Sequence, residues 1–198
     1  MSTQEVPLTY EGVMGMIRES ARNFDRMMQE SNEKFDRIMQ ETNRKISDLG
    51  SRVGEIVENM VAGNIVAKFQ AKGYGVTDCK KNWPFKNKKL GIRGEVDLFL
   101  DDDPDDGEVA EIAILIEVKT ALETYDVRKH IERLEKFRRC LDARGNTAKM
   151  RVIGAVAGGV IKGDADEVAQ ENGLYVIVQS GDAVEIVVPP EGFVAKEW

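Results

Sequence analysis

Charged side chains occur in two segments that otherwise read as β-strands. The segment 93–100 (RGEVDLFL) alternates in polarity and carries Asp97, whereas 112–119 (IAILIEVK) is almost wholly apolar and contains Glu117 and Lys119. Side chains two residues apart on a strand share a face, so Glu117 and Lys119 project together. Because an unpaired charge is costly to bury, this spacing indicates a purpose beyond packing.

The connection between these strands, 101–111 (DDDPDDGEVAE), is polar and rich in turn residues, which predicts a hairpin. A hairpin centred on Gly107 places Asp97 ten residues before the centre and Glu117 ten after it. The two carboxylates are then expected to be directly paired, with Cβ atoms roughly 5 Å apart. Adjacent carboxylates repel each other unless a cation lies between them, so the pair predicts a divalent-metal site with Lys119 beside it.

Alternation along the first strand assigns Glu95 and Asp97 to one face and Val96, Leu98 and Leu100 to the other. An alternative interpretation keeps the hairpin but treats its charged residues as solvated groups on edge strands.

Around the hairpin the chain predicts a compact α/β domain. A long helix ends near Gly73 and is followed by a strand, a basic loop and the two hairpin strands; an amphipathic helix, a strand, a short helix and two strands come after them. Outside the hairpin, the predicted elements are strand 74–83, loop 84–93, helix 126–144, strand 150–157, helix 164–172, strand 174–180 and strand 183–188.

The order and spacing of these charges match a known pattern. Asp97, followed on the next strand by Glu117-Val118-Lys119, resembles the active site of the PD-(D/E)XK nuclease superfamily. The resemblance covers about residues 53–180 and implies a restriction-endonuclease-like core: helix, three strands, helix and strand in a mixed sheet. Glu95-Val96 stands where that motif has Pro before Asp. The strings most similar to the archaeal Holliday-junction-resolvase-like branch are Gly94-Glu95-Val96-Asp97 and Ile116-Glu117-Val118-Lys119-Thr120.

The resemblance implies hydrolysis of phosphodiester bonds, most of all in DNA. It implies Mg²⁺, or Mn²⁺, held by Asp97, Glu117, Glu58 and the Val118 carbonyl. Such a metal lowers the pKa of bound water and neutralises charge on the phosphate. Lys119 is expected to orient that water or to stabilise the transition state.

The family also implies an acid on the helix before the first strand. Glu58 is preferred because no cation lies three or four residues from it on that helix, and Glu55 is the alternative. Glu95, Lys129 and His130 are candidates for an outer shell around the metal. For the two helical residues, Lys129 and His130, a solvated helix face is the simpler interpretation.

Net charge alone argues against a nucleic-acid partner, since the chain carries −7 and has a sequence pI of about 5.0. The distribution reverses that inference: 101–111 holds seven acids, whereas 68–93 holds eight bases and one acid. Trp83 and Phe85 interleave with these bases, which suits backbone contact and base stacking. Packing of the two aromatic residues on the core, with solvated lysines, is the alternative. The predicted nucleic-acid-binding residues are Lys80, Lys81, Lys86, Lys88, Lys89 and Arg93.

The first part of the chain is an eleven-residue repeat, in the blocks 10–20, 21–31, 32–42 and 43–53. Apolar residues recur at fixed places in each block, and an eleven-residue period keeps such a stripe on one helix face. A helix with this stripe needs a partner, so we expect a homo-oligomeric coiled coil, a dimer or larger, through 10–61. The alternative is a helix lying on its own domain. The chain thus divides into a segment 1–52 and a nuclease-like domain 53–198.

Composition excludes several other classes. Two cysteines are too few for a disulfide scaffold, and no apolar run approaches a membrane span, so we expect a cytoplasmic protein without a membrane partner. A single histidine, His130, excludes a His-based metal cluster within one chain. Two functions remain: a metal-dependent nuclease, or a catalytically inactive nuclease-like scaffold or binding module.

Overall fold

The computed structural model describes residues 9–102, 110–145, 150–181 and 183–198. The chain divides into two units, Met1–Gly50 and Ser51–Trp198, and each is described by itself. The predicted hairpin centre, Gly107, and most of the acidic connection lie outside the described residues.

Unit 1 is helical from residue 10 to its end and forms the first part of α1 (Tyr10–Gln70). No proline interrupts this helix, and ion pairs one turn apart, such as Glu33–Arg37 and Glu41–Lys45, support it. Within unit 1 the apolar stripe of the repeat is exposed, including Phe24 and Phe35 at about 60%. The coiled coil expected from this stripe stays a prediction.

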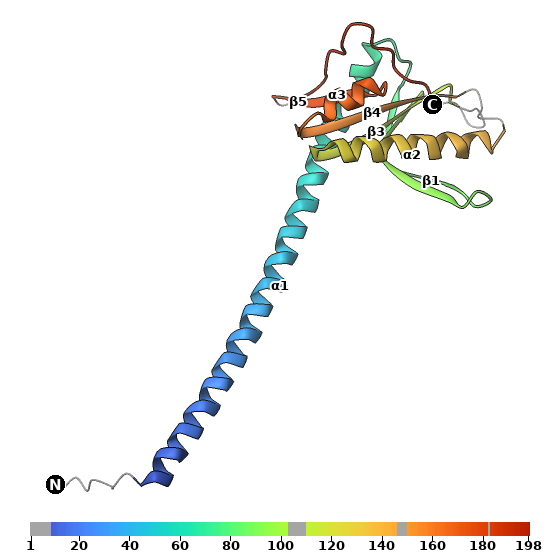
Figure 1. Cartoon of the computed structure of the whole chain (residues 1–198). Helices are drawn as coiled ribbons and strands as arrows, with labels where there is room; N and C mark the ends of the chain where they lie inside the picture. The colour runs from blue at the N-terminus through green and yellow to red at the C-terminus, as the bar shows by residue number, and fades with distance from the viewer. Residues whose placement is uncertain (1–8, 103–109, 146–149, 182) are drawn as a thin grey trace. The chain divides into compact units, whose positions relative to one another are not determined.

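Unit 2 is a six-stranded mixed sheet with helices on both faces (Figure 1). The strands lie in chain order; β3, β4 and β5 run parallel, and the remaining neighbours are antiparallel. After α1 the elements are β1 (Asp78–Asn87), β2 (Ile92–Asp101), β3 (Ile112–Leu122), α2 (Thr124–Asp142), β4 (Arg151–Ile161), α3 (Ala165–Glu171), β5 (Tyr175–Ser180) and β6 (Ala183–Ile186).

This arrangement confirms the predicted α/β class and the predicted order of helix, three strands, helix and strand. The prediction of the first strand at 74–83 is wrong in its bounds, because β1 begins at Asp78, not at residue 74. The predicted basic loop 84–93 is therefore the second half of β1, a turn and the start of β2. Pro84 and the lysines made this stretch look like a loop, but β1 is an edge strand, where proline is tolerated.

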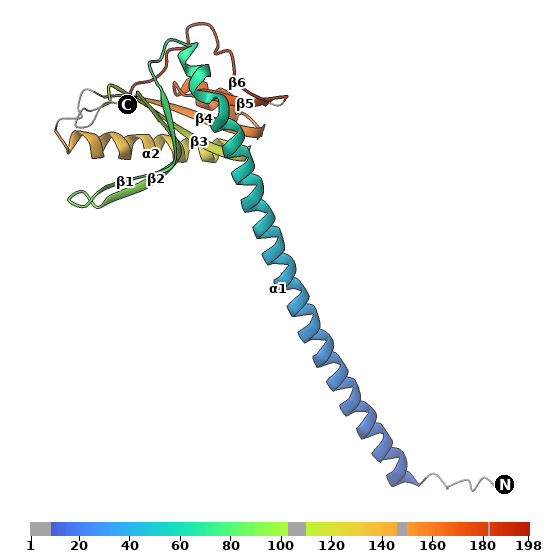
Figure 2. The same cartoon turned by 180° about the vertical axis from the view of Figure 1, so that it is seen from behind.

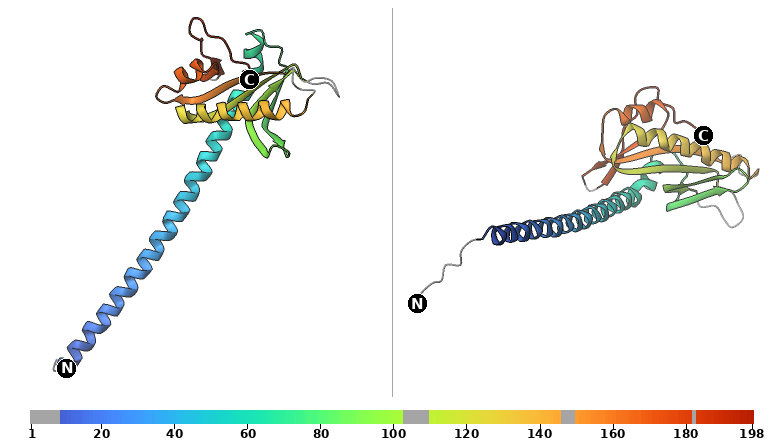
Figure 3. Two further views of the ribbon diagram at one scale, coloured as in Figure 1. Left: turned by 45° about the vertical axis from the view of Figure 1, so that its right-hand side comes forward. Right: turned by 60° about the horizontal axis from the view of Figure 1, so that its bottom comes forward.

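Two apolar cores lie on opposite faces of the sheet. Figures 2 and 3 show the helices that cover these faces. One is built with α2 and α3, and the other with the end of α1, which contributes Val61, Ile65 and Phe69. Both faces of β3 are covered, which explains its nearly continuous apolar run.

The predicted face assignment of β2 is wrong at one place. Leu98 and Leu100 pack in the core on the α1 side, as one face of a strand should. Val96, which regular alternation places with them, packs instead in the α2-side core together with Phe99. The alternation therefore breaks between Val96 and Leu98, at Asp97.

A local distortion of the β1–β2 ladder accounts for this break. Trp83 pairs with Val96, but Asn82 and Asp97 are not among the described pairs, and Asn82 has a φ of 49°. A backbone in this left-handed region does not continue a regular strand. Asp97 thus occupies the position where β2 changes faces.

No helix in the described part of the chain combines the length and the apolar character needed to cross a bilayer. The cytoplasmic location stays a prediction.

Candidate active site

The candidate site lies where β2 and β3 separate. Their antiparallel register is that of the predicted hairpin, and its last described pair is Leu98 with Ile116. Asp97 and Glu117 are the next residues on each strand, directly beyond the end of the ladder. There the Val118 backbone N–H donates a hydrogen bond to Asp97 Oδ2 at 2.7 Å. The Asp97 carboxylate therefore takes the place of a strand partner for β3.

Lys119 joins the two carboxylates. Its Nζ lies 2.6 Å from Glu117 Oε1 and 4.0 Å from Asp97 Oδ2. The structure brings these three side chains together, but Asp97 and Glu117 are not the directly paired residues that the hairpin predicted, because the described ladder ends at Leu98 and Ile116. A single ammonium group between two carboxylates shows that this position favours positive charge.

Glu117 is buried, with 4% of its surface exposed, and its second oxygen has a different partner. Arg133 of α2 donates a charge-assisted hydrogen bond to Glu117 Oε2. Sequence analysis missed Arg133 as a site residue. The available signal was its spacing of three from His130, since residues three apart on a helix are neighbours.

His130 is fully buried, which corrects the interpretation of this residue as part of a solvated helix face. Its Nε2 lies 3.1 Å from the Leu115 carbonyl oxygen, and its Nδ1 lies 4.0 Å from Glu117 Oε2. Nδ1 has no hydrogen-bond partner among the described residues. Burial, opposed by the hydrogen bond to Leu115 and assisted by the charge of Lys119, lowers the pKa of His130 to about 4. The imidazole is therefore neutral near pH 7.

Lys129, the neighbouring candidate, lies elsewhere. It is exposed, its Nζ lies 3.1 Å from a carboxylate oxygen of Glu132, and it lies over the ring of Tyr125. Its described contacts therefore do not join it to Glu117.

Glu58 of α1 is partly buried and lies within the electrostatic influence of Asp97 and Lys119. Burial raises its pKa, and the negative charge of Asp97 raises it further, whereas Lys119 opposes this effect. Glu55 is exposed and acts on Glu58 as a second negative charge. The mutual influence of Glu58 and Asp97 favours Glu58 over Glu55 as the helical acid.

The donor types suit a hard divalent cation, because carboxylate oxygens are ligands that Mg²⁺ and Mn²⁺ accept. Repulsion between Glu58 and Asp97 is the electrostatic condition that such a cation relieves. Both oxygens of Glu117, however, are bound by protein cations, and no group of three acidic, cysteine or histidine side chains in the described residues is gathered closely enough to hold a metal. The residue types fit a metal, but Lys119 and Arg133 already contact Glu117, and their positive charges oppose the binding of a cation there.

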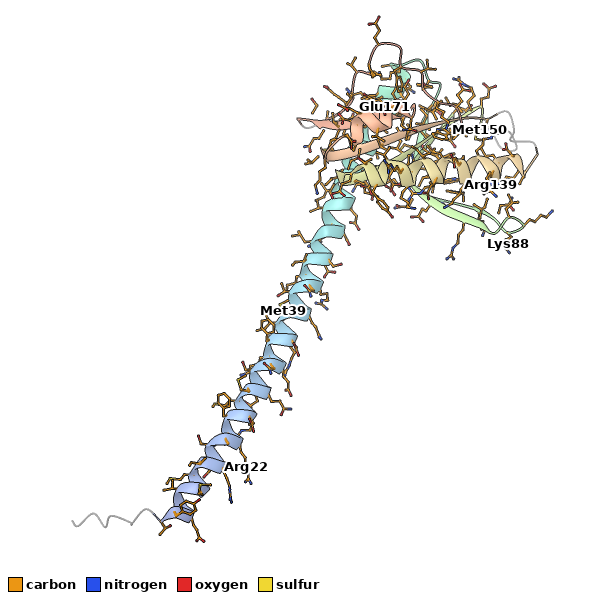
Figure 4. All side chains as sticks on the ribbon, in the orientation of Figure 1. Arg22, Met39, Lys88, Arg139, Met150 and Glu171 are labelled. Atoms are coloured by element: carbon orange, nitrogen blue, oxygen red, sulfur yellow. The ribbon has the colours of Figure 1, made fainter. Side chains whose placement is uncertain are left out.

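The six predicted nucleic-acid-binding residues fall into two groups. Lys80 and Lys81 have partners within the domain: Lys80 Nζ lies 2.7 Å from Asp101, and Lys81 donates to Asn59 of α1. The other four are exposed and lie toward the far end of the β1–β2 hairpin, whose tip carries Lys88 (Figure 4). They are Lys86, Lys88, Lys89 and Arg93.

Glu95 lies on the same hairpin and is exposed. It lines a cavity of about 520 Å³ together with Lys86 and Arg93, and none of its described contacts joins it to Asp97 or Glu117. The structure therefore places Glu95 beside the hairpin cations.

No protein-family profile and no curated protein sequence matches the chain. Among solved structures it is similar to a repair endonuclease from Pyrococcus abyssi, with 17% identity and a TM-score of 0.40, over 67% of this chain and 47% of that one. A protein of unknown function from Silicibacter pomeroyi shows 15% identity and a TM-score of 0.35, over 72% and 73% of the two chains. An EndoMS complex with dsDNA shows 18% identity and a TM-score of 0.31, over 63% and 45%. The chain thus spans about half the length of the first and third structures.

Proposed function

We propose that this protein is a metal-dependent nuclease that hydrolyses phosphodiester bonds, most of all in DNA. The observation that supports the proposal is the meeting of Asp97, Glu117 and Lys119 at the end of the β2–β3 ladder, with Glu58 acting on Asp97 from α1. Carboxylates that converge around a lysine suit the transfer of a phosphoryl group, where charge accumulates on oxygen.

In this proposal Asp97, Glu117, Glu58 and the Val118 carbonyl hold Mg²⁺ or Mn²⁺. The bound metal supplies a water of lowered pKa and neutralises charge on the phosphate. Lys119, released from Glu117, orients the attacking water or donates to a phosphate oxygen.

Residues of α2 position Glu117 in this scheme. Arg133 contacts one carboxylate oxygen of Glu117, and neutral His130 fills the space behind it. The Nε2–H of His130 donates to the Leu115 carbonyl, which fixes the ring orientation.

The proposal includes assembly through unit 1. Its exposed apolar stripe, repeated every eleven residues, is best covered by a second copy of the same helix. A dimer or larger assembly then brings two sites to one nucleic acid.

A cleavage assay tests the activity. The purified protein is incubated with labelled duplex, single-stranded and branched DNA in the presence of Mg²⁺ or Mn²⁺, beside Lys119→Ala and Asp97→Ala. We expect metal-dependent cutting that both variants lose by at least about 100-fold, the effect of removing one transition-state contact. Lys129→Ala is the matched control, because Lys129 is an exposed lysine that contacts Glu132. Cutting that survives in both site variants contradicts the assignment of the site.

The occupied oxygens of Glu117 favour a second candidate, an inactive nuclease-like scaffold, because Lys119 and Arg133 already neutralise this acid. The same assay separates the two functions: a scaffold cuts no substrate with either metal.

A further inference from the structure

The β1–β2 hairpin continues beyond the sheet as a two-stranded ribbon. Pairing of β2 with β3 ends at Leu98, whereas pairing of β2 with β1 continues to Ile92, opposite Asn87. Figure 1 shows this end of the hairpin projecting from the sheet. We call the residues 82–97 beyond the β2–β3 ladder the ribbon.

The ribbon carries several positively charged side chains that make no described ion pair within the domain. Lys86 and Arg93 are directly opposite each other, and Lys88 and Lys89 form the turn between the strands. Like charges directly opposite in an antiparallel pair are destabilising. No described ion pair neutralises these four cations, in contrast to Lys80, which binds Asp101. An external anion is the partner that would offset this repulsion.

A cavity on the ribbon brings two of these cations to the same place. Lys86 and Arg93 both line the space of about 520 Å³, together with Pro84, Phe85 and Gly94. A phosphate in this space would meet both cations beside the apolar side chains of Pro84 and Phe85. Glu95 also lines this space and repels an anion there, so a bound phosphate would lie on the side of the two cations.

We propose that the ribbon enters a groove of double-stranded DNA and binds its phosphates on one side of the bond that is cut. This inference rests on the proposed function for its partner. The major groove of DNA admits a two-stranded β-ribbon, whereas a single strand offers no groove.

The site and the ribbon are parts of one strand, which sets the length of DNA required. Arg93 lies four residues from Asp97 along β2, roughly 13 Å at 3.3 Å per residue, and the turn lies roughly 20 Å away. At 3.4 Å per base pair, these distances correspond to roughly four to six base pairs. A ribbon that lies along the DNA axis would thus cover roughly four to six base pairs on its side of the scissile bond.

Binding without cleavage tests this inference. Fluorescence anisotropy measures the affinity of the full chain in EDTA for a 20-base-pair duplex and for the corresponding single strand, between 50 and 300 mM salt. The ribbon variant carries four changes: Lys86→Gln, Lys88→Gln, Lys89→Gln and Arg93→Gln. We expect at least tenfold weaker duplex binding, and a salt slope that is smaller by about 3 to 4, because each lost phosphate contact removes about 0.9 from the slope.

The control variant removes the same charge from unit 1, and we expect it to leave the slope for the duplex unchanged. Its changes are Arg18→Gln, Arg22→Gln, Lys34→Gln and Arg44→Gln. If the ribbon variant is misfolded by circular dichroism, Lys88→Gln with Lys89→Gln, both in the turn, replaces it, with an expected decrease in slope of about 2.

Three results overturn the inference: unchanged duplex binding in the ribbon variant, an equal loss for the single strand, or no duplex binding by the unaltered chain. If the ribbon variant loses duplex binding but the unaltered chain cuts no DNA with Mg²⁺, duplex binding by the ribbon stands, whereas the proposed activity and the position of the ribbon relative to a cut bond fail. Cutting of DNA with binding that does not depend on the ribbon overturns the inference alone.

Discussion

Glu117 has a different cation on each of its two carboxylate oxygens, Lys119 from its own strand and Arg133 from α2. The acid is buried, so neither interaction is weakened by full exposure to water. The positive charges of these two groups oppose the binding of any metal at Glu117. Lys119 and Arg133 differ in their other contacts. Lys119 also faces Asp97, whereas the described contact of Arg133 within the site is with Glu117 alone.

Replacing Arg133 should lower the stability of the fold and at the same time strengthen metal binding. Arg133→Ala removes a charged hydrogen bond and lowers the free energy of unfolding by about 2 kcal/mol. It also frees Glu117 Oε2, so we expect tighter Mn²⁺ binding. Urea unfolding and Mn²⁺ titration by calorimetry measure the two effects. Arg128→Ala, an exposed arginine on the same helix, is the control and should change neither quantity. Unchanged or weaker Mn²⁺ binding in Arg133→Ala contradicts the competition.

His130 should make stability depend on pH in a defined window. Its pKa is about 4 in the folded protein against about 6.5 in an unfolded chain, so below pH 6.5 the unfolded state binds a proton that the folded state does not. Stability is therefore full above pH 6.5 and falls as pH decreases toward 4, by up to roughly 3 kcal/mol.

The variant His130→Gln isolates this contribution, because the amide can still donate to the Leu115 carbonyl and does not titrate. The difference in unfolding free energy between the original chain and the variant should decrease steadily from pH 7 to pH 4.5 in urea melts. A difference that stays constant with pH would show that His130 is not buried as a neutral ring.

Among the elements, the hairpin strands were the most predictable from sequence. Apolar alternation and an antiparallel connection fix the register, so Asp97 and Glu117 could be matched before any coordinates were known. The change of face at Asp97 could not be predicted, because it follows from the distortion at Asn82 on the neighbouring strand. A sequence pattern records the period of one strand and not the distortion imposed by another.

The role of α2 was less predictable for a related reason. The apolar period of 126–144 correctly identified a helix, and Val127 and Leu134 are buried as expected. Which polar residues border that face depends on how the helix crosses β3. His130 is thus buried over the Leu115 carbonyl, and Arg133 reaches Glu117, through tertiary packing alone.

The ribbon depends on a close contact at Gly94. A Cβ atom there would lie 2.4 Å from the ring of Phe85, on the paired strand. Phe85 is itself fixed against Phe137 of α2, with ring centroids 5.3 Å apart, so it cannot withdraw easily. We expect Gly94→Val to lower the free energy of unfolding by about 1–3 kcal/mol. Gly63→Ala is the opposite control, since its helical site is open and the change should stabilise by about 0.5–1 kcal/mol. Thermal unfolding measures the change in stability of each variant. Changes of the same sign in the two variants would contradict this explanation.

At the scale of the whole molecule, unit 1 contributes no residue of the candidate site but carries most of the exposed large apolar side chains. We expect the full chain to be an oligomer and a chain lacking residues 1–52 to be a monomer, because the truncation removes most of the repeated stripe. Light scattering coupled to size exclusion measures both masses. A monomeric full chain at micromolar concentration contradicts the prediction.

The separation of β2 from β3 beyond Leu98 also has a kinetic consequence. Within the sheet β3 has a neighbouring strand on each side, whereas the ribbon part of β2 has only β1. Near the turn, where Lys88 and Lys89 are exposed, local opening then requires less of the domain to unfold, so amide protons there should exchange with solvent faster than those of Ile114 or Ile116. Hydrogen exchange followed by mass spectrometry would show this gradient along β2. The strand that carries the candidate catalytic acid thus runs from a part paired on both sides to a turn that only β1 supports.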